Sequence, residues 1–169
     1  MRMYYKWEEL LKWINFNARI RKLNMYNPDE SYKFVSWNVN GMKSWIAENG
    51  KAQLQLFIEN EAPTCLMLQE TKLSGGEGDA YKHLFSGYKG YFSSSAVNGS
   101  SGTAVFLKTD GPEIVRITFG KGGKDQEGRT IVVEYSDMYL VNSKLSASPF
   151  TKKATFRTLV RNSNVWITE

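Results

Sequence analysis

Two short apolar runs that end abruptly in polar residues dominate the hydrophobic pattern of this chain. The first run, KFVSWNVNG, begins at Lys33, and the second, CLMLQETK, begins at Cys65. Both are rich in strand-forming residues, which predicts two buried β-strands over residues 33–38 and 64–69. Residues 43–60, between them, carry apolar positions at helical spacing. A strand, a crossover helix and a second strand form a βαβ-like unit in which the two strands lie side by side.

From residue 88 onward the pattern changes to short apolar segments separated by turns. This spacing is typical of antiparallel sheet. A glycine-rich loop at residues 74–78 precedes this region, but no Gly-Lys-Ser/Thr follows it, which disfavours a phosphate-binding loop. Residues 81–85 are expected to form one or two helical turns. The strands predicted after residue 88 are 90–94, 102–108, 113–118, 130–135 and 138–142.

The two ends of the chain differ from this central region. Residues 5–23 predict an amphipathic helix that packs on the domain or on a partner. An organelle-targeting segment is the alternative, which Glu8 and Glu9 disfavour because such segments are poor in acids. The last residues show no strong periodicity and are compatible with a weak amphipathic helix or a strand. We therefore divide the chain into an N-terminal helix and linker (1–32), a central domain (33–143) and a divergent basic tail (144–169).

Composition and charge add a modest constraint. A length of 169 residues and a hydrophobic content of 41% suit one globular domain. The net charge is +5, but residues 33–143 carry eleven basic and twelve acidic residues, so the excess positive charge lies in the flanks. Charge alone therefore gives weak support for nucleic-acid binding by the central domain.

The length of the apolar runs and the number of cysteines indicate the cellular compartment. No apolar run is long enough to span a bilayer, so no membrane partner is expected. The single cysteine, Cys65, lies within an apolar run, which favours a reducing, intracellular compartment. We expect a nuclear location in a eukaryote and a cytoplasmic one in a bacterium, with an organelle as the alternative if the N-terminal segment is a targeting signal.

The ends of the two central runs carry the candidate chemistry. Asn38 and Glu70 are expected at one edge of the sheet, where open α/β sheets commonly bind ligands. A carboxylate beside a carboxamide, without a thiol or imidazole, is an all-oxygen site that suits a hard cation such as Mg²⁺. The plainer interpretations are an ordinary acid at a strand end for Glu70 and turn geometry for Asn38.

These motifs resemble the exonuclease III/apurinic endonuclease family of the endonuclease/exonuclease/phosphatase superfamily. SWNVNG (36–41) and LQETK (68–72) match two family motifs in the same order. Residues 99–105 resemble the family's GYSGVG strand entry, with serine in place of an aromatic residue, and DQEGR (125–129) matches a further segment closely. The resemblance covers roughly residues 33–143.

The resemblance implies an α+β, DNase I-like fold, in which a two-sheet sandwich has helices outside it in a four-layer αββα arrangement. It implies hydrolysis of a phosphodiester with Mg²⁺, or Mn²⁺ in its place, at abasic sites in double-stranded DNA, together with 3′–5′ exonuclease activity. Asn38 and Glu70 would be the catalytic residues and the metal ligands. The residues that would contact DNA are Asn40, Lys43, Lys72 and Arg129.

Several family features are absent from this sequence. Lys144 stands where the family has the tyrosine of YVPN, and no Asp-Leu-Asn or terminal Ser-Asp-His segment follows. The only histidine, His83, lies between Lys82 and Leu84 and is expected on the surface. We therefore expect the product of a truncated or misframed gene, with weak or no activity. Half of a sandwich would also expose an apolar inner face, which predicts self-association.

Three functional hypotheses follow. The first is a DNA repair nuclease of which this chain is the N-terminal half. The second is a phosphatase or deadenylase of the same superfamily, which the DQEGR segment disfavours. The third is a non-catalytic fragment that binds DNA or a partner through its basic flanks, and its DNA binding would depend strongly on salt.

Overall fold

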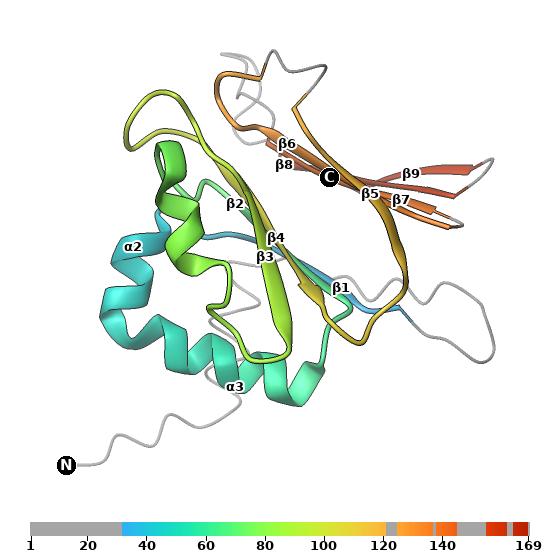
Figure 1. The fold of residues 1–169 in the computed structure, drawn as a ribbon, viewed down its shortest axis with the longest axis horizontal. Helices are drawn as coiled ribbons and strands as arrows, with labels where there is room; N and C mark the ends of the chain where they lie inside the picture. Colours follow the sequence, from blue (N-terminus) through green and yellow to red (C-terminus); the bar gives the residue numbers. More distant parts are fainter. Residues whose placement is uncertain (1–31, 121–124, 137, 145–154, 162–163, 169) are drawn as a thin grey trace.

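Two β-sheets pack face to face, and helices cover the outer side of the first sheet (Figure 1). The computed structural model describes residues 32–120, 125–136, 138–144, 155–161 and 164–168. In these residues the fold is α+β with three layers, helix, sheet and sheet. The expected class of a two-sheet sandwich is confirmed, and among the described residues no helix covers the outer face of the second sheet (Figure 1).

The first sheet is built around the predicted βαβ-like unit. Its strand order is β1-β2-β4-β3, with β1 and β2 parallel and the other two pairs antiparallel. Each of these strands begins and ends close to its predicted position. Their bounds are Phe34–Asn38 for β1, Cys65–Gln69 for β2, Tyr88–Ser93 for β3 and Thr103–Lys108 for β4.

The crossover between β1 and β2 consists of three successive helical segments. These are α2 (Met42–Trp45), a π-helical turn η1 (Ile46–Gly50) and α3 (Lys51–Glu61). The π-turn allows the Trp45 ring to pack against the backbone of Gly50, where a Cβ atom would lie 2.3 Å from the indole. The predicted helix is therefore present, but it is wound in three segments.

A 3₁₀ helix η2 (Gly75–Tyr81) occupies the region expected to be a glycine-rich loop. Ser74 and Glu77 form a capping box, in which the Glu77 carboxylate accepts a hydrogen bond from the Ser74 backbone N–H at 2.9 Å. The helical turns expected at 81–85 are thus displaced toward the N-terminus, because the Ser-x-x-Glu signature at 74–77 starts the helix earlier.

The second sheet is antiparallel throughout, in the order β5-β6-β7-β8-β9. Its first three strands were predicted, whereas the last two lie in the segment that was compatible with helix or strand. The expected division after residue 143 falls within β7, and β8 and β9 continue its sheet. The bounds are Ile114–Phe119 for β5, Thr130–Tyr135 for β6, Met138–Lys144 for β7, Thr155–Arg161 for β8 and Asn164–Thr168 for β9.

The first sheet is buried on both faces, and alternation along β2 shows how. Leu66 and Leu68 pack toward the helices with Phe57 of α3, and Cys65 and Met67 face the second sheet. Complete burial of such a side chain stabilises the fold by roughly 1.5–3 kcal/mol. The second sheet contributes Ile131, Val133, Tyr135, Met138 and Leu140 to the layer between the sheets.

The apolar inner face of the first sheet is therefore covered. The expectation of an exposed, unpaired face was wrong for these residues, because β6 and β7 supply the opposing layer. The expected helix at residues 5–23 lies outside the described part of the chain. Within the described part, no helix has both the length and the apolar character needed to cross a membrane.

Candidate functional site

The polar ends of β1 and β2 meet at one edge of the first sheet, as the parallel pairing predicted. The strand register places Asn38 opposite Gln69, so Glu70 follows at the same edge. Backbone hydrogen bonds continue past the strands into the loops. The N–H groups of Val39, Gly41 and Met42 donate to the carbonyls of Gln69, Glu70 and Thr71 at 3.0, 2.8 and 2.9 Å.

Two further loops and the end of β7 join this edge. The N–H groups of Thr71 and Lys72 donate to the carbonyls of Gly102 and Ser101 at 3.1 and 2.9 Å. Gly102 N–H donates to the Glu127 carbonyl at 3.2 Å, and Lys144 N–H donates to the Arg129 carbonyl at 2.8 Å. Five segments that are distant in sequence are thus connected by main-chain bonds. We call them the Glu70 edge: residues 38–42, 70–72, 101–102, 127–129 and Lys144.

Backbone strain is concentrated at the Glu70 edge. Four non-glycine residues there have positive φ: Asn40 at 47°, Glu70 at 54°, Lys72 at 54° and Ser101 at 50°. Only two other described non-glycine residues share this conformation. Such conformations cost of order 1–3 kcal/mol each and are common at functional sites. This signal identifies the edge without reference to any relative.

The two asparagines form a compact turn that orders the first loop. The Asn38 carboxamide oxygen accepts a hydrogen bond from the Asn40 N–H at 3.1 Å. The Asn40 carboxamide oxygen accepts one from the Lys72 ammonium at 2.7 Å. Asn38 thus stabilises a turn, as the plainer interpretation expected. Its side-chain oxygen also lies at the edge that was expected to bind a cation.

Glu70 is ion-paired with Lys144. The distance from Lys144 Nζ to Glu70 Oε1 is 3.4 Å, and the two side chains are only 25% and 24% exposed. The family resemblance implied that Lys144 stands at the position of a tyrosine. It did not reveal this pair, which forms only when β7 packs against the first sheet. Lys144 therefore lies at the candidate site, although the sequence analysis did not include it among the site residues.

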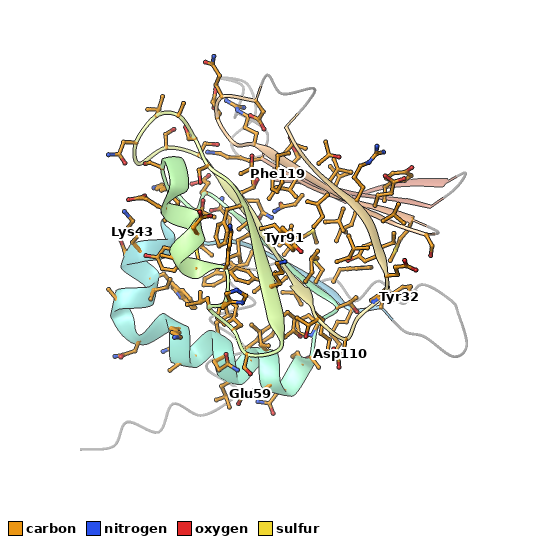
Figure 2. The ribbon with its side chains drawn as sticks, in the orientation of Figure 1. Tyr32, Lys43, Glu59, Tyr91, Asp110 and Phe119 are labelled. Carbon is orange, nitrogen blue, oxygen red and sulfur yellow. The ribbon has the colours of Figure 1, made fainter. Side chains whose placement is uncertain are left out.

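The other two predicted basic residues are each paired with a neighbouring carboxylate. Lys43 lies on α2 beside η2 (Figure 2), and its ammonium contacts Glu77 Oε1 at 2.5 Å. This hydrogen bond raises the pKa of Lys43 and lowers the pKa of Glu77. The Arg129 guanidinium pairs with Glu127, and Asp125 accepts the Arg129 N–H at 2.6 Å. This is the local ion-pair geometry of a stable turn.

A buried polar network lies directly beneath Glu70. The Gln69 amide donates to Ser36 Oγ at 2.9 Å and to Asn142 Oδ1 at 2.7 Å. The Asn142 amide donates to the carbonyls of Leu68 and Ala104 at 3.0 and 2.8 Å. Gln69 and Asn142 are fully buried. Their hydrogen bond joins β7 to the first sheet at the residue just before Glu70. Sequence reasoning missed both, although Asn142 follows Met138 and Leu140 on the inward face of β7.

The oxygen donors at the edge fit a loosely held Mg²⁺. This ion is usually held by one or two carboxylates, with water and substrate phosphates completing its shell. Glu70 and Asn38 meet that minimum, and among the described residues there is no group of three or more His, Cys, Asp or Glu suited to a metal. Three buried oxygens here have no hydrogen-bond partner within the described structure: Gln69 Oε1, Thr71 Oγ1 and Ser101 Oγ. A Mg²⁺ ion held by Glu70 and Asn38 would therefore take its remaining ligands from water and phosphate.

Several known proteins with similar sequences are named as repair nucleases or apurinic endonucleases. DNA repair nuclease APEX1 of Danio rerio is 35% identical over 118 residues, which cover 66% of this chain and 35% of that protein. The DNA-(apurinic or apyrimidinic site) endonuclease of Dictyostelium discoideum is 32% identical over 115 residues, covering 68% of this chain and 30% of that protein. The crystal structure of AP endonuclease LMAP from Leishmania major superposes with a TM-score of 0.64 at 29% identity, over 86% of this chain and 54% of that one.

The matched part of this chain is similar in sequence to members of the exonuclease III/apurinic endonuclease family, and similar in fold to an AP endonuclease. No family model matches the sequence. The chain spans about a third of the length of these two sequence relatives. This similarity supports the DNase I-like sandwich and a relationship to nucleases. The single histidine, His83, is exposed in the turn after η2, as expected, and does not belong to the Glu70 edge.

Proposed function

We propose that this chain binds the phosphodiester backbone of DNA at the Glu70 edge, as part of a repair nuclease that acts at abasic sites. The observation that carries this proposal is the meeting of Asn38 and Glu70 at the ends of two parallel strands, beside Lys72 and Lys144. An all-oxygen donor pair surrounded by ammonium groups suits a phosphate together with a hard cation.

The basic groups provide the anion-binding part of the site. Lys72 is positioned by its bond to Asn40, and its stem lies near Gly41, where a Cβ atom would be 3.8 Å from Lys72 Cδ. Lys43 is exposed on α2 and is linked to η2 through Glu77. Each lysine now has an uncharged or anionic protein partner, which a DNA phosphate would replace. Binding should therefore weaken steeply as salt concentration rises.

Glu70 and Asn38 would hold Mg²⁺, or Mn²⁺ in its place. When bound, the ion supplies charge that polarises the phosphate and stabilises the leaving oxygen. The protein's own contribution is to hold the Glu70 carboxylate in a strained backbone conformation over the Gln69 network. Lys72 and Lys43, with Arg129 once it is released from Glu127, would orient the DNA backbone.

A general base is the component that the described edge does not supply. Nothing among its described side chains is an imidazole. Its two carboxylates are Glu70, which is the proposed metal ligand, and Glu127, which is paired with Arg129. Catalytic groups of this kind act as a unit, so losing one lowers the rate by orders of magnitude. We therefore expect this chain by itself to bind DNA and to cut it slowly or not at all. A non-catalytic DNA-binding role is the second candidate, and the net positive flanks favour it.

One experiment separates these roles. A duplex oligonucleotide with a single abasic-site analogue is incubated with the purified chain, with Mg²⁺ or EDTA, and both incision and binding are measured. Glu70→Gln is compared with Glu59→Gln, which changes an exposed carboxylate on α3 (Figure 2) by the same single charge. Metal-dependent incision that is lost only in Glu70→Gln supports the nuclease, whereas salt-sensitive binding without incision supports the second role. Absence of binding contradicts both.

A further inference from the structure

We propose that Lys144 is a built-in cation at the Glu70 edge that competes with a divalent metal for Glu70. This inference rests on the proposed metal site and adds a determinant of its affinity. Among the described residues, the ion pair that includes Glu70 is with Lys144, at 3.4 Å. Both side chains are about three-quarters shielded from solvent, so the pair is screened less than a fully exposed one.

The position of Lys144 follows from the packing of β7. Side chains alternate along a strand, so Lys144 lies on the same face as Asn142, two residues earlier. Asn142 is held inside by the carbonyls of Leu68 and Ala104 and by Gln69. Because Asn142 contacts Gln69, the next inward-facing residue of β7 comes to lie next to Glu70.

The main chain holds this arrangement in place. Lys144 N–H donates to the Arg129 carbonyl at 2.8 Å, and the preceding Ser143 lies within 3.0 Å of Thr130 through their hydroxyl oxygens. The backbone that carries the Lys144 side chain is therefore fixed by hydrogen bonds at the position from which the ammonium reaches Glu70. An ammonium at this point supplies one of the two positive charges that a divalent metal would bring.

Competition has a defined consequence for binding. A metal that takes Glu70 as a ligand must displace the ammonium or share the carboxylate with it, and in both cases two cations lie close together. Metal affinity is therefore lower than Glu70 and Asn38 alone would give. A phosphate brought in by DNA offsets this repulsion, so metal and DNA should bind more tightly together than separately.

The test measures Mn²⁺ binding directly, by loss of the free-ion electron paramagnetic resonance signal, and needs no turnover. Lys144→Met is expected to bind Mn²⁺ about three- to tenfold more tightly than the unmodified protein, because it removes a partly shielded charge. Lys144→Arg keeps the charge and should retain the weak affinity. Lys108→Met removes an equal charge from a surface pair with Asp110 and should leave affinity unchanged.

The outcomes distinguish this inference from the proposed metal site. Glu70→Gln should weaken Mn²⁺ binding both on its own and when it is combined with Lys144→Met. Unchanged affinity in Lys144→Met, with weaker binding in Glu70→Gln, would overturn the competition and leave the metal site intact. Equal binding with and without Glu70, or no detectable binding in any variant, would overturn both. Circular dichroism confirms that each variant is folded before it is scored.

Discussion

Replacing Asn142 with alanine should destabilise the protein strongly, because this side chain connects the two sheets. The change removes three buried hydrogen bonds, from the Gln69 amide at 2.7 Å and to the Leu68 and Ala104 carbonyls at 3.0 and 2.8 Å. A buried bond contributes about 1 kcal/mol net, and an acceptor or donor left unpaired costs about 1–3 kcal/mol. We expect a loss of about 3–4 kcal/mol, a large share of the ~5–15 kcal/mol that holds a typical domain folded.

Urea unfolding followed by tryptophan fluorescence measures this loss. Trp37 and Trp45, whose ring centroids lie 4.8 Å apart in an edge-to-face arrangement, report on the helix-covered side of the first sheet. The matched control is Asn60→Ala, which removes one exposed bond to the Leu56 carbonyl from α3 and should cost less than about 0.5 kcal/mol. A loss below about 1 kcal/mol for Asn142→Ala would show that the network contributes little and would refute this reasoning.

Four further outcomes are expected. Gly102→Ala should lower the free energy of unfolding by about 1–3 kcal/mol, measured by urea titration, because φ is +81° there and a Cβ atom would lie 2.5 Å from Thr71 Oγ1. The Cys65 thiol should react with a disulfide reagent only on unfolding, since it is fully buried and burial raises its pKa. Burial raises the pKa of Tyr88 from 10 to about 12, so the folded state favours the neutral phenol. The stability that this provides is complete below pH 10 and is lost as the pH rises from 10 to 12. Melting temperatures of Tyr88→Phe should therefore fall less steeply over this pH range than those of the unmodified protein. Lys72→Ala should weaken DNA binding uniformly across sequences and reduce the slope of log affinity against log salt by about 1, measured by fluorescence anisotropy.

The sequence was sufficient for the parts of the fold that depend on neighbouring residues. The apolar run before Glu70 and the one before Asn38 predicted two buried strands, and the crossover helix between them implied parallel pairing. Parallel strands end at the same edge, so the meeting of these two residues followed directly. The antiparallel strands β3 to β7 were also predicted, because turn residues separate their apolar segments at short intervals, whereas β8 and β9 were not.

The parts that were missed depend on contacts between distant segments. The ion pair of Lys144 with Glu70 and the bond between Gln69 and Asn142 each join residues more than 70 positions apart. Neither can be inferred from local periodicity, because both require the register of β7 against the first sheet. The displaced helix at η2 is different, since its Ser-x-x-Glu signature was present and the glycine content obscured it.

The main-chain bonds of the Glu70 edge have a consequence for how this surface changes over evolutionary time. The loops are held together by peptide groups, from Val39 to the Gln69 carbonyl and from Lys72 to the Ser101 carbonyl, and peptide groups are present whatever the side chain. Replacement of the Glu70 or Lys144 side chain therefore leaves these main-chain hydrogen bonds in place. Such an edge can accumulate new specificities while the protein still folds, which makes it a suitable starting point for directed evolution of altered ion or anion preference.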